Sequence, residues 1–460
     1  MAPVEMKRRM EKRLGWGEGQ QPSHLARSLR MKTASAMEAC VGLDPKTGPR
    51  KAALAFVFIT VVLDMLALGV IVPVLPGLVV SFVGGNTARG AEVLGLFGTL
   101  WAAMQFLFSP LLGSLSDRYG RRPVILISNF GLGLDYFLMA LAPTLSWLLV
   151  GRIVSGITSA STSAAGAYIA DVTPPEKRAA GFGILSVAFG LGFVMGPAIG
   201  GFLGEFDPRL PFWVAGGLSV LNALYGLFVL PESLTHDKRM RFAMRRANPI
   251  GSVGLLRRHR ELMGLTAVNF IGNIVHEAYP TIFVLYAMYR YGWGDRAVGL
   301  TIATVGVSSA IVGGVLVQPV VARFGERRTM LIGLVFGATG FAITGFAPTG
   351  LIFWLGVPIN ALWGLYGPPM QGLMTRRVAA TEQGQLQGAQ SSVRGIAMML
   401  GPGIFTGVFA AAIGGWREWG LPGAPFILAA IMLASAMGVA WRVTGPGAAA
   451  GEAMVAEPAS

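Results

Sequence analysis

Long apolar runs separated by short polar stretches dominate this chain of 460 residues. A helix of about 20 apolar residues is long enough to cross the hydrocarbon core of a bilayer. Lipid offers no hydrogen-bonding partner, so a spanning segment must satisfy its own backbone polar groups, as a helix does. The pattern therefore predicts an all-α membrane protein with about twelve transmembrane helices. The predicted spans are 52–80, 93–112, 124–141, 148–170, 181–203, 211–230, 262–289, 298–321, 330–347, 351–373, 388–413 and 425–443.

Several glycine, proline and arginine residues of the first half recur in the second half at one fixed sequence separation. The pairs that lie 205 positions apart are Arg118 and Arg323, Gly120 and Gly325, Arg122 and Arg327, Gly151 and Gly356, Gly183 and Gly388, and Gly196-Pro197 and Gly401-Pro402. A repeat of this size in an apolar chain is typical of a secondary transporter built from two related bundles. We therefore predict two pseudo-symmetric six-helix bundles, at 52–233 and 262–443.

Composition and charge agree with a membrane protein. Hydrophobic residues make up 53% of the chain and charged residues 13%, whereas soluble domains carry about 25% charged residues. The net charge of +14 could suggest a nucleic-acid partner, but the basic residues gather on one side of the predicted membrane. The opposite side holds only Arg89, Arg209, Arg290, Arg296 and Arg417. By the positive-inside rule we expect both termini in the cytoplasm and no nucleic-acid partner.

Three polar segments flank or separate the predicted bundles. The tail 1–51 lacks the apolar core of a secretory signal, and it is either disordered or forms an amphipathic surface helix near 6–14. The linker 234–261 is basic with one aromatic residue, Phe242, and we expect it on the cytoplasmic membrane surface. A second cytoplasmic tail is predicted at 444–460. The single cysteine, Cys40, excludes a disulfide framework, and we expect no metal and no cofactor.

A burst of charge, GSLSDRYGRR, lies between the second and third predicted spans. We expect Gly113 to permit a close helix approach and Gly120 a tight turn. Asp117 is placed to meet a helix N-terminus or a cation from the other half. The arginines can bind carboxylates, and contacts of this kind can latch one state of a transporter. The predicted latch consists of Gly113, Asp117, Arg118, Gly120, Arg121, Arg122, Asp171 and Arg394.

The stretch GSLSDRYGRRP resembles the signature loop of the major facilitator superfamily. The blocks LDMLALGVIVPVLPGL, GRIVSGIT, GAYIADVTPPEKRA and GFVMGPAIGG resemble the bacterial tetracycline/proton antiporters within it, and the likeness covers nearly the whole chain after Lys51. The resemblance implies a major-facilitator fold with a central cavity, in a bacterial inner membrane. It also implies a non-enzymatic carrier that functions as a monomer and exports amphipathic drug-like compounds, with the proton as coupling ion.

The fifth predicted span carries glycines in the spacing G-x8-G-x3-GP-x2-GG. Its residues are Gly183, Gly192, Gly196, Pro197, Gly200 and Gly201. Small residues let helices pack backbone against backbone, and proline removes one backbone hydrogen bond and bends the helix. In the resembling family this pattern is called the antiporter motif, which favours movement of substrate and proton in opposite directions.

Two aspartates, Asp64 and Asp135, fall near the middle of predicted spans. A charged side chain there costs roughly 2.5–3.5 kcal/mol on insertion scales, so it should face the protein interior. Each is either a proton or substrate site or a carboxyl that only fixes helix packing. Arg152 lies near them in the fourth span and could face either aspartate or an anionic group of the substrate. Gln105 and Gln371 are further polar candidates for the cavity.

The seventh span carries His276 and Glu277, where the chain departs from the resembling antiporters. Those proteins have a histidine at the position of Ser309 and an aspartate at that of Gly337, so the same proton relay cannot operate here. His276 and Glu277 could replace it, because histidine titrates near neutral pH. Arg394, in the eleventh span, could pair with Asp117, with Glu277 or with substrate, or could extend to the membrane surface.

Other classes of function remain as alternatives. A proton-coupled metabolite carrier differs from an exporter in the direction of flux, and a non-transporting sensor would use the long N-terminal tail. A membrane enzyme is disfavoured because the sequence has no metal cluster, nucleophile constellation or phosphate-binding loop. The missing relay residues leave open whether tetracycline is a substrate.

Overall fold

A computed structural model describes residues 48–159, 161–173, 178–234, 239, 260–379 and 382–445, and every element in these ranges is helical. Residues 54–460 form one compact unit, to which all contacts below belong. Almost all of the predicted N-terminal tail, most of the linker and the C-terminal tail beyond Gly445 lie outside the described residues.

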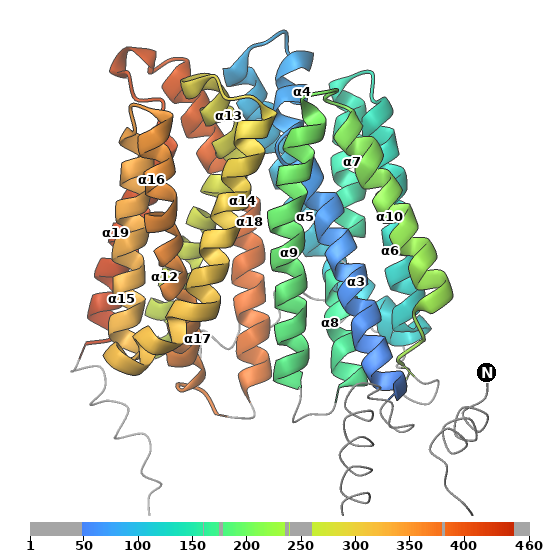
Figure 1. Ribbon diagram of the computed structural model, residues 1–460. Coiled ribbons are helices and arrows are strands. Elements are labelled where there is room, and N and C mark those ends of the chain that lie inside the picture. Colours follow the sequence, from blue (N-terminus) through green and yellow to red (C-terminus); the bar gives the residue numbers. More distant parts are fainter. Residues whose placement is uncertain are drawn as a thin grey trace, which may run out of the picture. The chain divides into compact units, whose positions relative to one another are not determined.

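The first half of the chain forms eight described helices. They are α3 (Gly48–Ile71), α4 (Leu75–Phe82), α5 (Thr87–Tyr119), α6 (Arg121–Leu141), α7 (Leu145–Thr158), α8 (Ser161–Val172), α9 (Arg178–Gly204) and α10 (Leu210–Val229). In Figure 1, α8 lies below α7, so the two together make one crossing. Pro73 lies in the short break between α3 and α4, where its ring is incompatible with a continuous helix.

The second half is likewise helical. Its elements are α12 (Arg260–His276), α13 (Ala278–Tyr291), α14 (Asp295–Ile311), the π-helix η5 (Val312–Leu316), α15 (Val317–Phe346), α16 (Gly350–Ala361), the 3-10 helix η6 (Leu362–Leu365), α17 (Gly367–Thr375), α18 (Gln383–Ile413), the 3-10 helix η8 (Arg417–Trp419) and α19 (Ala424–Val443). Irregular turns of π and 3-10 type are common at functional positions in long helices.

Twelve membrane crossings account for these helices. Within the described residues, nine segments are long and apolar enough to span a membrane. One of them, Asp295–Phe346, has 52 residues and turns back at Gly325, so it supplies two crossings. Two more are assembled from shorter helices, α7 with α8 and α12 with α13. The predicted all-α fold with about twelve transmembrane helices is confirmed.

The repeat seen in the sequence is also present in the backbone. Gly120 has φ 112° and Gly325 has φ 77°, in the left-handed region that glycine adopts without strain. Each glycine lets the chain reverse between two spans. Helix α3 ends at Ile71 and α12 at His276, 205 positions later. We call the membrane side that carries Gly120 and Gly325 the loop end.

The two halves contact each other through two equivalent helix pairs, α9 with α14 and α5 with α18. In Figure 1, α9 and α14 run side by side in the centre of the molecule. Small residues allow the close approach: a Cβ added at Gly98 would stand 2.9 Å from the Pro402 ring, and one at Gly299 would collide with the Pro197 carbonyl oxygen. The Thr99 hydroxyl donates to the Met399 carbonyl oxygen at 3.1 Å across the same boundary.

The glycine pattern of α9 packs against α3, the helix that carries Asp64. A Cβ added at Gly196 would stand 2.7 Å from the Cα of Gly69, and one at Gly200 would collide with the Val70 carbonyl oxygen. Gly201 instead faces α14 of the other half. Gly183 lies on α9, but its surroundings are outside the described residues. The motif therefore holds one helix against both a bundle neighbour and the opposite half.

Gly200→Ala tests this packing. Its new methyl group would overlap the Val70 backbone, and overpacking of this kind costs roughly 1–3 kcal/mol. Gly190→Ala in the same helix is the matched control, because a Cβ there meets no atom within 4 Å. Thermal unfolding in detergent should show a lower midpoint for Gly200→Ala and an unchanged or higher one for Gly190→Ala. Equal midpoints would contradict the packing described.

Candidate functional site in the membrane interior

Asp64 lies on α3 and is half-buried. Its Oδ1 accepts a hydrogen bond from the Asn222 side-chain amide at 2.8 Å, and the same nitrogen donates to the Thr60 carbonyl oxygen at 2.9 Å. Asn222 is fully buried on α10. An amide donor is uncharged, so it orients the carboxyl without neutralising it. Sequence reasoning missed Asn222, although an asparagine in an otherwise apolar sixth span was the signal available.

Asp135 lies on α6 and is only 2% exposed. Within the described part of the chain neither of its carboxyl oxygens has a hydrogen-bond partner. A Cβ added at Gly151 would stand 2.9 Å from Oδ1, so the small residue on α7 makes room for the carboxyl. Burying a polar group without a partner is costly, and such groups are uncommon inside folded proteins.

Arg152 follows Gly151 on α7 and supplies the positive charge of this region. Its charge lies within electrostatic reach of Asp135 and of the Tyr136 hydroxyl, and Asp64 also acts on Tyr136. The guanidinium contacts the Met139 sulfur at 3.8 Å, and its Nε is buried without a partner among the described residues. We call Asp64, Asp135, Tyr136, Arg152 and Asn222 the acidic cluster.

The first helix of the second half is interrupted at the place where the first half separates α3 from α4. Between α12 and α13 the chain leaves the helix at Glu277, directly after His276. A Cβ added at Gly401 on α18 would stand 2.5 Å from the Glu277 Cβ, so Glu277 packs against that helix. The positive charge of Arg394 reaches both His276 and Glu277. Broken helices at this depth are a common way to build transporter sites.

Two aromatic residues, Trp363 on η6 and Tyr366 directly after it, lie near the exposed His276 side chain. The His276 and Trp363 ring centroids lie 6.1 Å apart, and Trp363 stacks on Tyr366 at 6.2 Å with 13° between the rings. The Tyr366 hydroxyl lies 3.3 Å from Asn269 Oδ1, and Trp363 Nε1 is buried without a partner among the described residues. We call His276, Trp363 and Tyr366 the aromatic cluster. Sequence reasoning missed both aromatic residues, since tryptophan and tyrosine are common in any apolar span.

Trp363 also explains the glycine at position 337. A Cβ added at Gly337 would stand 2.8 Å from the Trp363 ring and 2.8 Å from Leu433, so no larger side chain fits there without rearrangement. Ser309 is exposed on α14, and Gln105 and Gln371 are half-buried on α5 and α17. The Trp363 indole ring therefore fills the space beside Gly337.

The charged loop contacts its own half in this structure. Arg121 binds Asp117 at 2.5 Å and Asp171 at 3.1 Å, and it donates to the Ser116 hydroxyl at 2.7 Å. Its side chain is 11% exposed, so one buried guanidinium joins α5, α6 and α8. The predicted partnership of Asp117 with the other half stays a prediction. A Cβ added at Gly113 would meet no atom within 4 Å, so no close helix approach occurs there.

Glu232, which the sequence did not predict to belong to this site, also binds the charged loop. Its carboxylate accepts the backbone N–H groups of Arg121 and Arg122, at 2.9 and 3.3 Å. These are free N–H groups of the first turn of α6, where an anion is favoured. The Arg122 side chain donates to the Leu227 carbonyl oxygen. The remaining basic residues of the predicted latch, Arg118 and Arg394, are exposed.

An ion pair at the equivalent place in the second half has its charges exchanged. Arg376 binds Glu326 at 2.8 Å, and these residues lie 205 positions after Asp171 and Arg121. The geometry of the duplicated bundle is thus retained while the acid and the base have changed places. The Arg376 side chain is 74% exposed, in contrast to Arg121, so the two pairs should differ in strength.

Replacing each arginine by alanine measures that difference. Arg121→Ala should cost roughly 1.5–3 kcal/mol, because it removes a largely buried guanidinium that binds Asp117, Asp171 and Ser116. Arg376→Ala should cost less than about 1 kcal/mol, because its pair faces solvent. Unfolding midpoints of the two purified variants provide the comparison. A loss in Arg376→Ala as large as that in Arg121→Ala would refute the assignment of Arg121 as the buried junction.

Known proteins share both the sequence and the fold. Residues 57–402 match the model of the Major Facilitator Superfamily. The chain is 38% identical to the class C tetracycline resistance protein of Escherichia coli, over 79% of this chain and 91% of that protein. It is 37% identical to the class G tetracycline resistance protein of Vibrio anguillarum, over 78% and 90%.

Solved structures agree in fold. The crystal structure of the nucleoside transporter NupG superposes with a TM-score of 0.70 at 13% identity, over 85% of this chain and 98% of that one. A bacterial homologue of the lysosomal transporter Spinster, in an inward-facing unoccupied conformation, gives a TM-score of 0.68 at 18% identity, over 86% and 96%. The family match, the tetracycline resistance relatives and the paired bundles lead to one conclusion: this chain is a membrane transporter that belongs to the Major Facilitator Superfamily.

Proposed function

We propose that this transporter exports amphipathic drug-like compounds in exchange for protons. The observation that carries the proposal is the buried, unpartnered carboxyl of Asp135 beside the charge of Arg152 in the membrane interior. A carboxyl in this position can take up a proton when water is excluded and release it when water reaches it. The names of the similar tetracycline resistance proteins support export of a drug.

The acidic cluster would perform the coupling by alternating access. A proton that enters from outside binds Asp64 or Asp135, and the loss of that negative charge frees Arg152 to reorganise. The substrate leaves, the halves rock about the α9–α14 and α5–α18 pairs, and the proton is released towards the cytoplasm. Differential binding of proton and substrate to the two states then drives the exchange.

Membrane orientation follows from charge in this proposal. The loop end carries Arg118, Arg121, Arg323 and Arg328, and short basic loops remain on the cytoplasmic side. The loop end would then face the cytoplasm of a bacterial cell, with both termini inside. The Arg121 and Arg376 ion pairs would lie at the cytoplasmic ends of the bundles, where they can open and close during transport.

The aromatic cluster would supply the substrate surface of the second half. Trp363 and Tyr366 offer stacked rings, the indole Nε1 offers a hydrogen-bond donor, and Arg394 adds positive charge nearby. Planar compounds with a carbonyl or an acidic group match this combination. The substrate range would therefore depend on the Trp363 indole ring, which fills the space beside Gly337.

The coupling is tested by removing the charge without changing the shape. Asp64→Asn and Asp135→Asn should each abolish substrate-driven proton movement in vesicles, because the amide cannot carry the proton. Glu418→Gln, an exposed residue of η8, is the matched control and should behave as the wild type. A pH-sensitive dye in the vesicles reports the movement. Full proton movement in both aspartate variants would defeat the coupling proposal.

The aromatic surface is tested separately. Trp363→Ala should raise the KM for an aromatic substrate by about threefold to tenfold, since a stacked aromatic pair contributes roughly 0.5–1.5 kcal/mol. Trp363→Phe keeps a ring and should recover most of the lost affinity. Uptake into inverted vesicles at several substrate concentrations gives both values. An unchanged KM in Trp363→Ala would place the substrate elsewhere, while the result for Asp135→Asn would still stand.

A further inference from the structure

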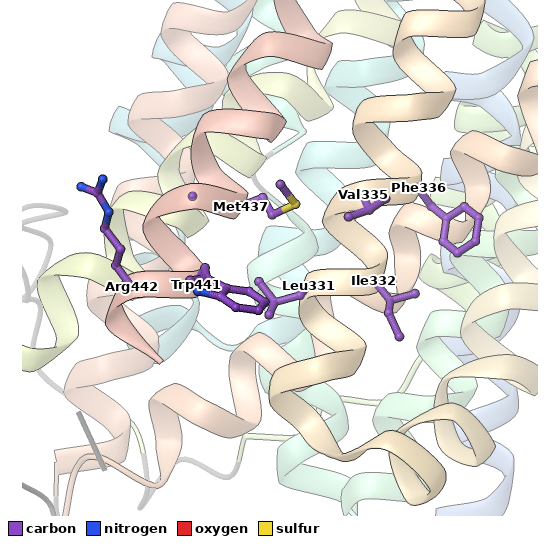
Figure 2. Close-up of a pocket in the computed structure, with 8 residues that line it drawn as sticks. Leu331, Ile332, Val335, Phe336, Met437, Trp441 and Arg442 are labelled. Carbon is purple, nitrogen blue, oxygen red and sulfur yellow. The ribbon is translucent and has the colours of Figure 1, made fainter. Parts of the chain in front are cut away.

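An apolar groove lies between α15 and α19 near the loop end. It has a volume of about 540 Å³ and is lined by Leu331, Val335, Met437, Gly438, Trp441 and Arg442, among others. Figure 2 shows Trp441 reaching from α19 across the gap towards Leu331, with Met437 above it and Val335 opposite. The groove belongs to neither the acidic cluster nor the aromatic cluster.

The membrane determines what kind of molecule can enter this groove. Both α15 and α19 are membrane-spanning helices, and the Val335 and Trp441 side chains are 46% and 63% exposed. An exposed apolar side chain on such a helix faces hydrocarbon rather than water. Tryptophan favours the boundary between hydrocarbon and headgroups, which places Trp441 at the depth where an acyl chain meets its polar head. An acyl chain is therefore the occupant that the walls suit.

Positive charge gathers where the groove reaches the loop end. Arg327 lies with its guanidinium 5.3 Å from the Trp441 ring centre, and its Nε donates to the Thr444 hydroxyl at 3.2 Å. Arg328 and Arg442 are exposed, and in the described part of the chain neither arginine forms an ion pair. The nearby Glu326 is engaged by Arg376. An anion from outside the chain would complete this end of the groove.

At the loop end of the first half, the arginines are neutralised by carboxylates of the chain itself. There Arg121 binds Asp117 and Asp171, and Glu232 accepts the backbone N–H groups of Arg121 and Arg122. Among the described residues of the second half, no acidic side chain pairs with Arg328 or Arg442.

We propose that the groove binds one anionic phospholipid. One acyl chain lies along Leu331, Val335 and Gly438, and the phosphate is held by Arg328 and Arg442. Arg327, fixed on Trp441 and Thr444, contributes charge from behind. Phosphate is the expected headgroup because guanidinium groups form strong, charge-assisted hydrogen bonds to its oxygens. The bound lipid would replace the carboxylates that neutralise the matching end of the first half.

Lipid retention by the purified protein tests the proposal. Protein in detergent is incubated with phosphatidylglycerol or with zwitterionic phosphatidylcholine, and bound lipid is counted by native mass spectrometry. The wild type should retain phosphatidylglycerol in preference to phosphatidylcholine. Arg328→Gln and Arg442→Gln should each weaken phosphatidylglycerol binding about fivefold, as expected for one basic charge near an anionic lipid. Arg417→Gln, at the opposite membrane side, is the control for charge.

Filling the groove provides a second test that keeps the charges. Gly438→Leu should also lower phosphatidylglycerol retention, and a Cβ there meets no atom within 4 Å, so the fold should tolerate it. Gly217→Leu, which is equally open on α10, is the control for added bulk. The proposal fails if the wild type shows no preference for phosphatidylglycerol. It fails equally if groove variants and controls lose the same amount of lipid.

Discussion

A carboxyl group held inside a membrane is the constraint on which this structure depends. Each charged carboxylate there costs roughly 2.5–3.5 kcal/mol, so the surrounding helices must shield it, hydrogen-bond it or give it a proton. The first half treats its two acids differently. Asp64 receives the Asn222 amide, whereas Asp135 has space beside Gly151 and the field of Arg152 but no hydrogen bond within the described residues. Close glycine packing joins α9 to α3, the helix that carries Asp64.

The two halves share one backbone arrangement, but they carry different side chains in their interiors. The interfaces α9–α14 and α5–α18 are the same contact made twice, which suits a rocking motion. The first half retains the acidic cluster. The second half has the aromatic cluster, and its loop-end ion pair has acid and base exchanged between Glu326 and Arg376. In our proposal the acidic cluster handles the proton and the aromatic cluster contacts the substrate.

Much of the fold could be predicted from the sequence because it depends on local and periodic signals. Apolar runs gave the crossings, and the offset of 205 positions gave the two bundles and the turns at Gly120 and Gly325. Part of the candidate site could also be predicted from the sequence, since an aspartate is easily recognised in an apolar run. The roles of Glu232 and Trp363 were not accessible, because they depend on contacts between distant segments. Asn222 stood out as an asparagine in an apolar span, but the sequence did not connect it with Asp64. Gly113 shows the converse, since its sequence context suggested a close approach that this structure lacks.

The central claim is that substrate and proton compete through the acidic cluster, and proton release from purified protein measures this most directly. Substrate is added to the protein in weakly buffered detergent solution containing a pH indicator. The account predicts release of protons from the wild type and a much smaller release when Asp135 is asparagine. Binding of substrate without any release of protons from the wild type would contradict it.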